Sequence, residues 1–390
     1  MFFTVLGGHS KFLLCILVLL LGYNCKENSN EDLMKLLMLG IVDDYVQNNN
    51  SCNSEFKNMS ILQGLTGRYA ATGTVLNNGE VAFIGGEELA NPISNRVELF
   101  NGSWNQGPSL NQNRQYHSST PLNDGNLLVI GGYDNVDLIN SVEKLNINTN
   151  TWNYVAPMNV ARALHQSVLL GDGQVLVVGG NLNNPNLADS AELYDYNQNQ
   201  WIRTVPMNSI RSQFTLTRLN DGRVIAVGGM GASTNLDSVE IFNPNTNNWT
   251  QVSHLNQARL EHSAILLSDG RLLVAGGRFI GAGNISTYLD SMEIYDPSKN
   301  VWTLSKMPVS RTEFTLNHLS DGSVLFIGGR NVNYVNENYR YFPNTNQWCS
   351  FIKLEKARYG HLSAKLSDHS ILIYGGSDSN GYAENAVRLY

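Results

Sequence analysis

Arginine and histidine recur together at a spacing of three residues, a pattern that suits anion binding or proton transfer. An arginine can clamp an anion, and a histidine can exchange a proton near neutral pH. In other copies of the motif, Phe214, Phe314 or Ala71 stands in place of the histidine. Because the position recurs and accepts apolar residues, we interpret the motif as mainly structural. The pairs are Arg114 and His117, Arg162 and His165, Arg259 and His262, and Arg358 and His361.

A glutamate also recurs once in most of these copies and offers a partner for the arginine. The glutamates are Glu98, Glu143, Glu192, Glu240 and Glu293. A buried charge needs a partner, so we expect each glutamate to pair with the arginine of its own copy. In the last two copies we assign Tyr339 and Arg388 to the glutamate position. This break suggests a modest anion-attracting patch there, and simple sequence drift is the alternative.

Longer loops interrupt the regular spacing in the fifth and sixth copies. An insertion at residues 278–288 lengthens the fifth copy, and residues 331–334 mark the sixth. Exposed tyrosine, asparagine and arginine suit contacts with sugars or proteins. No catalytic residue is predicted. The predicted ligand-binding residues are Arg278, Phe279, Tyr288, Tyr334, Tyr339 and Arg388.

Seven Gly-Gly pairs divide the chain at intervals of 46 to 52 residues. A fixed period of this length indicates one supersecondary unit repeated along the chain. Within each unit two apolar runs flank a turn such as Asp269-Gly270, which is a strong hairpin signal. A second pair of runs follows, so each unit predicts four short strands. The pairs begin at Gly85, Gly131, Gly179, Gly228, Gly276, Gly328 and Gly375.

The glycine pairs, the Arg-x-x-His openings and one tryptophan position recur together, and this combination closely resembles the kelch repeat. The resemblance covers residues 56–390. It implies an all-β propeller with one four-stranded antiparallel blade per repeat, arranged radially around a channel. The tryptophans are Trp104, Trp152, Trp201, Trp249, Trp302 and Trp348.

The two ends of the repeat region complement each other. There are seven repeat openings, but only six tryptophan-bearing fourth strands follow them, and Tyr390 comes after the third strand of the last repeat. We predict that residues 56–62 supply the missing strand. The result is a seven-bladed propeller whose last blade is closed by an N-terminal strand, which removes free sheet edges.

Residues 1–25 have the pattern of an export signal. The apolar run at residues 12–21 is too short to span a bilayer comfortably. The segment ends at Cys25 and resembles a bacterial lipoprotein signal, in which that cysteine is acylated. Gly22 and Asn24 depart from the usual lipobox, so an ordinary secretory signal and an uncleaved anchor stay open. Each alternative places the mature protein outside the cytoplasm, as an anchored lipoprotein or a secreted or periplasmic protein.

Residues 26–55 form a polar tether by composition, and two cysteines remain beyond the signal segment. Cys52 and Cys349 can form a disulfide in an exported protein, or they can stay unpaired, and the sequence leaves both open. No CxxC or Cys/His grouping occurs. No metal site and no cofactor are therefore predicted.

Charge limits the class of partner. The chain has 390 residues and a formal net charge of −7, without a Lys/Arg-rich block. A general nucleic-acid binder presents a basic face, so no nucleic-acid partner is expected.

The fold alone does not assign an activity. Kelch-type propellers include galactose oxidase, with a copper centre and a Tyr–Cys crosslink, and sialic-acid mutarotases, which use polar residues on the channel face. The resemblance therefore keeps a carbohydrate-active enzyme of the mutarotase/epimerase or galactose-oxidase kind as an alternative. Our leading interpretation is a non-catalytic monomer at the cell envelope that binds a protein or a glycan and reaches the membrane through a lipid anchor.

Overall fold

The computed structural model describes most of the chain, and its described residues are 59–62, 67–88, 93–181 and 187–390. The chain separates into two compact units, residues 1–54 and 55–390, and all described residues belong to the second. The predicted signal segment and tether, with Cys25 and Cys52, lie outside the described residues. In the described part of the chain, no helix is long and apolar enough to cross a membrane.

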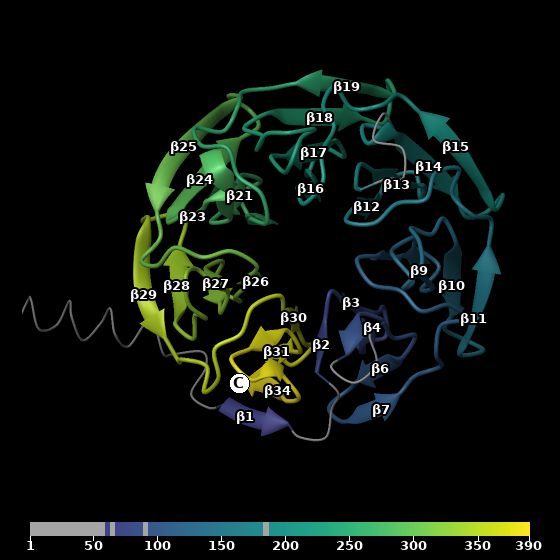
Figure 1. Ribbon diagram of the computed structural model, residues 1–390, viewed down its shortest axis with the longest axis horizontal. Helices are drawn as coiled ribbons and strands as arrows, with labels where there is room; N and C mark the ends of the chain where they lie inside the picture. The colour runs from purple at the N-terminus through teal and green to yellow at the C-terminus, as the bar shows by residue number, and fades with distance from the viewer. Residues whose placement is uncertain (1–58, 63–66, 89–92, 182–186) are drawn as a thin grey trace, which may run out of the picture. The chain divides into compact units, whose positions relative to one another are not determined.

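Seven four-stranded antiparallel sheets surround one axis as the blades of a propeller (Figure 1), which confirms the predicted fold class. Blade one comprises β3 (Thr72–Val75), β4 (Val81–Ile84), β6 (Val97–Phe100) and β7 (Trp104–Gln106). Blade two comprises β8 (Ser118–Pro121), β9 (Leu127–Ile130), β10 (Val142–Asn146) and β11 (Thr151–Val155). Blade three comprises β12 (Gln166–Leu169), β13 (Val175–Val178), β14 (Ala191–Asp195) and β15 (Gln200–Thr204).

The next three blades follow the same order from the axis outward. Blade four comprises β16 (Thr215–Arg218), β17 (Val224–Val227), β18 (Val239–Asn243) and β19 (Asn248–Gln251). Blade five comprises β20 (Ser263–Leu266), β21 (Leu272–Ala275), β24 (Ser291–Asp296) and β25 (Val301–Lys306). Blade six comprises β26 (Thr315–His318), β27 (Val324–Ile327), β28 (Asn338–Phe342) and β29 (Gln347–Phe351).

Blade seven joins the two ends of the propeller. Its strands are β30 (Leu362–Lys365), β31 (Ile371–Tyr374), β34 (Ala386–Leu389) and β1 (Met59–Leu62). β1 runs antiparallel to β34, with Met59 opposite Leu389 and Leu62 opposite Ala386 (Figure 1). The N-terminal closure is confirmed for residues 59–62, and residues 56–58 of the predicted strand lie outside the described residues.

The two ends of the propeller axis differ in their connections. The loop face carries the connections between blades and between second and third strands, such as residues 307–314 and 276–290. The turn face carries the hairpin turns, such as residues 219–223. The loop face also holds three short two-stranded antiparallel sheets: β2 (Arg68–Tyr69) with β5 (Glu87–Glu88), β22 (Arg278–Ile280) with β23 (Ser286–Tyr288), and β32 (Ser377–Asp378) with β33 (Gly381–Tyr382). The turn η2 (Ala282–Asn284) joins β22 to β23.

The hydrophobic cores lie between neighbouring blades. Val227 and Val239 of blade four pack with Val274 and Tyr295 of blade five, and Trp302 packs against this cluster. Second strands are buried on both faces because each lies inside a sheet that is itself covered by two blades; all four residues of β21 are buried. The Trp302 indole N–H also donates to the Ser253 carbonyl of the preceding connection at 2.8 Å. Trp302 therefore connects blade five to the end of blade four.

The Gly-Gly pair forms the joint between blades. Gly228 and Gly229 have φ of +58° and +98°, which disfavour any side chain. A Cβ on Gly229 would lie 2.5 Å from the Ser212 carbonyl oxygen, and one on Gly228 would lie 2.6 Å from that of Arg259 in the next blade. The Gly229 N–H donates to the same Arg259 carbonyl at 2.8 Å. The doublet recurs because the backbones of adjacent blades meet there.

Each regular blade contains one buried Arg–Glu pair, which we call a scaffold pair. In blade four, Arg211 Nη2 lies 2.6 Å from Glu240 Oε1, and both side chains are fully buried. Glu240 also accepts hydrogen bonds from the backbone N–H groups of Asn208 and Ser209. The predicted pairing is confirmed in blades one to five, in the pairs Arg68–Glu98, Arg114–Glu143, Arg162–Glu192, Arg211–Glu240 and Arg259–Glu293.

Blade six departs from the scaffold pair as predicted. Tyr339 stands opposite Phe326, in the glutamate position, and the Arg311 guanidinium lies 5.5 Å from its ring centroid. Burial lowers the pKa of Arg311 to about 10. The position of Asn208 in blade four, whose N–H binds the glutamate, is Pro308 in blade six. Proline has no N–H, so the loss of the glutamate leaves no backbone donor without its acceptor there.

The assignment of Arg388 to the glutamate position in blade seven was wrong. The register puts Val387 opposite Ile373, and Arg388 is one residue further along, opposite Leu372. Its side chain reaches the turn face, where it donates to Asp368 and to Ser370 Oγ. Because successive residues of a strand point to opposite faces, the one-residue error moved this side chain away from the expected patch.

Candidate functional site

The residues that open each repeat form a ring around the propeller axis on the loop face. The third residue of each opening has a φ between +51° and +60°. The N–H of Glu313 donates to the Glu261 carbonyl at 3.3 Å, and that of Gly360 donates to the Glu313 carbonyl at 2.9 Å. We call these third residues the axial ring: Ala70, Tyr116, Leu164, Gln213, Glu261, Glu313 and Gly360. The residues at these positions include apolar, aromatic, polar and acidic types.

Two adjacent members of the axial ring are glutamates, and each has its own arginine. Arg278, directly after the glycine pair of blade five, binds Glu261 through two parallel contacts of 2.6 Å and 2.8 Å. Arg330, at the same position of blade six, donates from Nη2 to Glu313 Oε1 at 3.1 Å. We call these the axial pairs. Their side chains are 11 to 32% exposed, whereas the scaffold pairs of blades two to five are fully buried.

Glu313 binds a proton more readily than an ordinary glutamate. Burial, then the negative charge of Glu261, raises the pKa of Glu313 to about 7, although Arg330 opposes the shift. Glu313 is also hydrogen-bonded to Glu261, which favours its protonated form. The Glu313 carboxyl group therefore changes its charge near neutral pH.

A group of tyrosines lies beside the axial pairs. Tyr69 crosses from blade one, and its hydroxyl lies 3.4 Å from Glu313 Oε2. Its ring packs edge-on against Tyr116 and Tyr359 and stacks on Tyr382. Burial raises the pKa of Tyr69 far above its usual value, so the phenol is neutral. Gly360 leaves room for this ring, because a Cβ there would overlap it.

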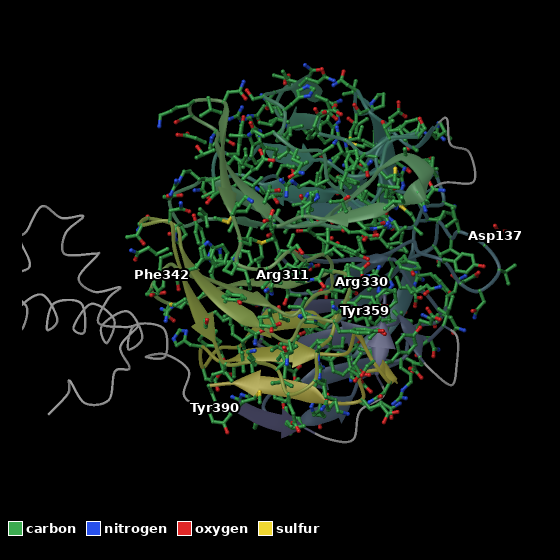
Figure 2. The ribbon with its side chains drawn as sticks, turned by 60° about the vertical axis from the view of Figure 1, so that its left-hand side comes forward. Asp137, Arg311, Arg330, Phe342, Tyr359 and Tyr390 are labelled. Carbon is green, nitrogen blue, oxygen red and sulfur yellow. The ribbon has the colours of Figure 1, made fainter. Side chains whose placement is uncertain are left out.

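Arg330 joins the glutamates to the tyrosines. Its guanidinium carbon lies 4.4 Å from the centroid of the Tyr359 ring, and Figure 2 shows the two side chains next to each other. Tyr334 packs on the other side of this group, 5.6 Å from Tyr359. We use the term axial site for Glu261, Arg278, Glu313, Arg330 and Tyr69. It offers hydrogen-bond donors and acceptors, fixed charges and aromatic faces within one region.

The predicted ligand-binding residues divide between this site and the rest of the molecule. Arg278 belongs to the axial site, and Tyr288 pairs with it across the β22–β23 hairpin. Phe279 is the outward neighbour of Arg278 and is 37% exposed, and Tyr334 is 43% exposed beside Tyr359. Tyr339 packs on Arg311 instead.

The recurring histidines have structural contacts. His165 Nε2 lies 2.9 Å from Ser118 Oγ of the preceding blade, and His262 Nε2 lies 2.9 Å from Thr215 Oγ1. Complete burial lowers the pKa of both histidines to about 3, so they are neutral at physiological pH. Such groups link blades and do not exchange protons near neutrality.

Sequence reasoning missed most of the axial site. Glu261 and Glu313 occur between residues of the Arg-x-x-His motif, and Arg330 follows a glycine pair. The available signal was variation: the third position of the opening differs among most repeats, whereas the arginine two residues earlier is the same in all seven. A position that varies inside a regular repeat is a candidate for function.

Two further predictions concern cysteine and metal. Cys349, in β29, is disulfide-bonded, but Cys52 lies outside the described residues, so the pairing of these two stays a prediction. Among the described residues, no group of three or more His, Cys, Asp or Glu side chains could hold a metal ion.

The fold and the repeated blade define a seven-bladed β-propeller. Models of the kelch motif match residues 116–159, 219–256 and 259–308. The chain thus contains kelch motifs within a seven-bladed β-propeller. No curated protein matches it by sequence.

Solved structures share this fold at low sequence identity. A fungal alcohol oxidase of the AA5 family, in complex with copper, aligns with a TM-score of 0.68 and 14% identity, over 86% of this chain and 76% of that chain. A protein called YjhT aligns with a TM-score of 0.59 and 17% identity, over 74% of this chain and 99% of that chain. At these identities the likeness concerns the fold alone.

Proposed function

We propose that the protein is a carbohydrate-binding propeller whose axial site holds a hydroxyl-rich ligand without transforming it. One observation carries the proposal: two Arg–Glu pairs and a tyrosine group occupy neighbouring positions of an otherwise varied ring. Sugar hydroxyls need donors and acceptors in close alternation, and sugar rings pack on aromatic faces. A protein partner would instead call for a broad, largely apolar area at the centre of the interface.

The test is binding of the purified full chain to a glycan array, followed by calorimetry with the sugars retained. Arg278→Gln removes a guanidinium whose side chain is 20% exposed and paired with Glu261. We expect at least a tenfold loss of affinity, because the carboxylate also loses its fixed orientation. Arg271→Gln is the matched control, since Arg271 forms a similar pair with Asp269 on the turn face.

Both variants are first compared with the unchanged protein by thermal unfolding, so that a folding defect is recognised. Binding that survives in the control and is lost in Arg278→Gln supports the proposal. The proposal is wrong if no glycan binds, or if Arg278→Gln binds as well as the unchanged protein.

Acid–base catalysis on the same ligand is a second candidate, because the pKa of Glu313 is about 7. A carboxyl group near that value can give and take a proton at neutral pH, and ring opening of a reducing sugar needs no more than proton transfer. Anomer exchange measured by NMR would be accelerated by the unchanged protein and not by Glu313→Gln. Binding without acceleration leaves the non-catalytic function in place.

We further propose that the propeller acts outside the cytoplasm as an anchored monomer at the cell envelope. The support is the sequence of residues 1–25, with its apolar run and Cys25. Detergent phase partitioning tests the anchor. A lipoprotein enters the detergent phase and its Cys25→Ser variant does not, whereas equal partitioning of the two into the aqueous phase would contradict lipidation.

A further inference from the structure

We propose that the ligand of the axial site carries an acid group and that Arg330 binds it. This inference rests on the proposed carbohydrate-binding function and narrows the ligand to an acidic sugar. The argument starts from the unequal way in which the two axial arginines are satisfied.

Arg278 is fully engaged by neighbouring side chains. Nε and Nη2 bind the two oxygens of Glu261, and Nη1 donates to Ser286 Oγ at 3.0 Å. Its positive charge is neutralised by a bidentate carboxylate, so it has little attraction left for another anion.

Arg330 is only partly engaged. Nη2 donates to Glu313 at 3.1 Å, while Nη1 makes no hydrogen bond to a described residue and the buried Nε has no partner among them. The side chain is 32% exposed, which gives a ligand access to the guanidinium. Tyr359 supports one face of the guanidinium and thereby fixes its plane, leaving an edge for an incoming anion.

The charge of Arg330 is also poorly compensated. Its partner Glu313 faces Glu261 and Arg330, and the phenol of Tyr69 reaches it. Tyr116 and Tyr359 lie around that phenol, and Tyr288 faces Arg330. The pKa of Glu313 is about 7, so below that pH this carboxyl group is mostly protonated. Arg330 then keeps its hydrogen bond to Glu313 but has no carboxylate charge opposite it.

A sugar with an acid group fits these surroundings. The acid group would take the free edge of Arg330, and the half-exposed ring of Tyr334 lies next to Tyr359 as a surface for the sugar ring. Glu87, which is hydrogen-bonded to Tyr382, lies on the tyrosine side of the ring and would repel an acid group placed there. The charges therefore favour one orientation.

This arrangement links binding to a proton. Below the pKa of Glu313, Arg330 is available to the ligand. Above it, the Glu313 carboxylate neutralises Arg330 and competes with the acid group. Affinity for an acidic sugar should consequently fall as the pH rises through neutrality, whereas affinity for a neutral sugar should change little.

The test is calorimetric titration of the full chain with glucose, glucuronate and glucose 6-phosphate, at about pH 6 and about pH 8. We expect at least one of the two acidic sugars to bind about tenfold tighter than glucose at the lower pH, and this preference to shrink severalfold at the higher pH. The stronger of the two identifies the acid group as carboxylate or phosphate. Arg330→Gln should abolish the preference, so that neither acidic sugar binds this variant tighter than glucose does.

Two further variants separate charge from structure. Glu313→Gln keeps an uncharged side chain at every pH, so it should retain the acidic preference at the higher pH. Arg223→Gln removes an arginine of similar exposure, 35%, on the turn face and should change nothing. Equal affinity for glucose and both acidic sugars would overturn this inference and leave the proposed function intact. Binding of none of the three sugars, together with an empty glycan array, would overturn both.

Discussion

The protein uses Arg–Glu pairs in two regions that differ in burial and in repetition. Scaffold pairs such as Arg211–Glu240 recur in blades one to five, and those of blades two to five are completely buried with nearly identical contacts. The axial pairs Arg278–Glu261 and Arg330–Glu313 are partly exposed and occur in two adjacent blades alone among the described residues. The same residue types therefore serve two purposes.

The difference follows from how completely each charge is satisfied. Glu240 binds one guanidinium and two backbone N–H groups, so both of its oxygens are engaged within the blade and are not available to a ligand. Glu313 has one arginine and a neighbouring carboxyl group, so its charge depends on pH and on what binds nearby. Repetition marks the pairs that hold blades together, and its absence marks the pairs that remain available.

The largest effect should come from breaking a scaffold pair. Glu240→Ala leaves Arg211 as a buried cation without its carboxylate and also removes the acceptor of two backbone donors. We expect a loss of about 3 to 5 kcal/mol in the free energy of unfolding, measured by urea denaturation. Asp237→Asn, at a side chain that is 53% exposed and paired with His254, should cost less than about 1 kcal/mol. A similar small cost for Glu240→Ala would refute the scaffold role.

Replacing the axial glutamate should have a smaller, pH-dependent effect of the opposite sign. The pKa of Glu313 is raised in the folded protein, so the folded state binds more protons than the unfolded state between about pH 4.5 and pH 7. Stability contributed by this group is present at low pH and is lost as the pH rises through that range. Glu313→Gln removes the loss.

The stability of Glu313→Gln relative to the unchanged protein should therefore increase from about pH 5 to about pH 8. The increase is expected to be on the order of 1 to 3 kcal/mol, since each pKa unit corresponds to about 1.4 kcal/mol. Thermal or urea unfolding of both proteins across this range measures it. If the difference in unfolding free energy between the two proteins stays constant with pH, the pKa of Glu313 is not raised in the folded protein.

The sequence allowed the scaffold to be predicted because the scaffold is what repeats. Gly-Gly pairs, tryptophans and Arg-x-x-His openings each have one structural explanation, and together they predicted the closure by β1. Glu261 and Glu313 gave no comparable signal, because a single glutamate in a loop is an ordinary feature of a sequence. The two residues are 52 positions apart in the chain, and only the fold brings their carboxyl groups into contact. Arg388 was misplaced because the register of a strand must be known to within one residue. The last repeat lacks the glutamate that marks this position in blades one to five, so the sequence did not fix the register there.

A change at the axial ring that involves no charge should test whether Tyr69 is held in place. In Gly360→Ala the new methyl group would overlap the Tyr69 ring, and the residue has a φ of +60°. We expect a loss of about 2 kcal/mol and, because Tyr69 must move from Glu313, a changed pKa of that carboxyl group. Gly222→Ala is the control for backbone strain, with a φ of +87° and nothing within 4 Å of the added Cβ. Equal losses in the two variants would show that the ring has room to move.

The smallest effect should come from removing one hydroxyl. Tyr69→Phe keeps the aromatic contacts but deletes the 3.4 Å contact to Glu313, which is long for a hydrogen bond. We expect a stability loss below about 1 kcal/mol and a slightly higher pKa of Glu313, because its carboxylate form loses a donor. NMR titration of the glutamate carboxyl carbons measures this shift, with Tyr154→Phe on an exposed outer strand as the control. A lower pKa would mean that the Tyr69 hydroxyl accepts a hydrogen bond from protonated Glu313. The direction of this contact would then be reversed, but the difference between scaffold pairs and axial pairs would remain.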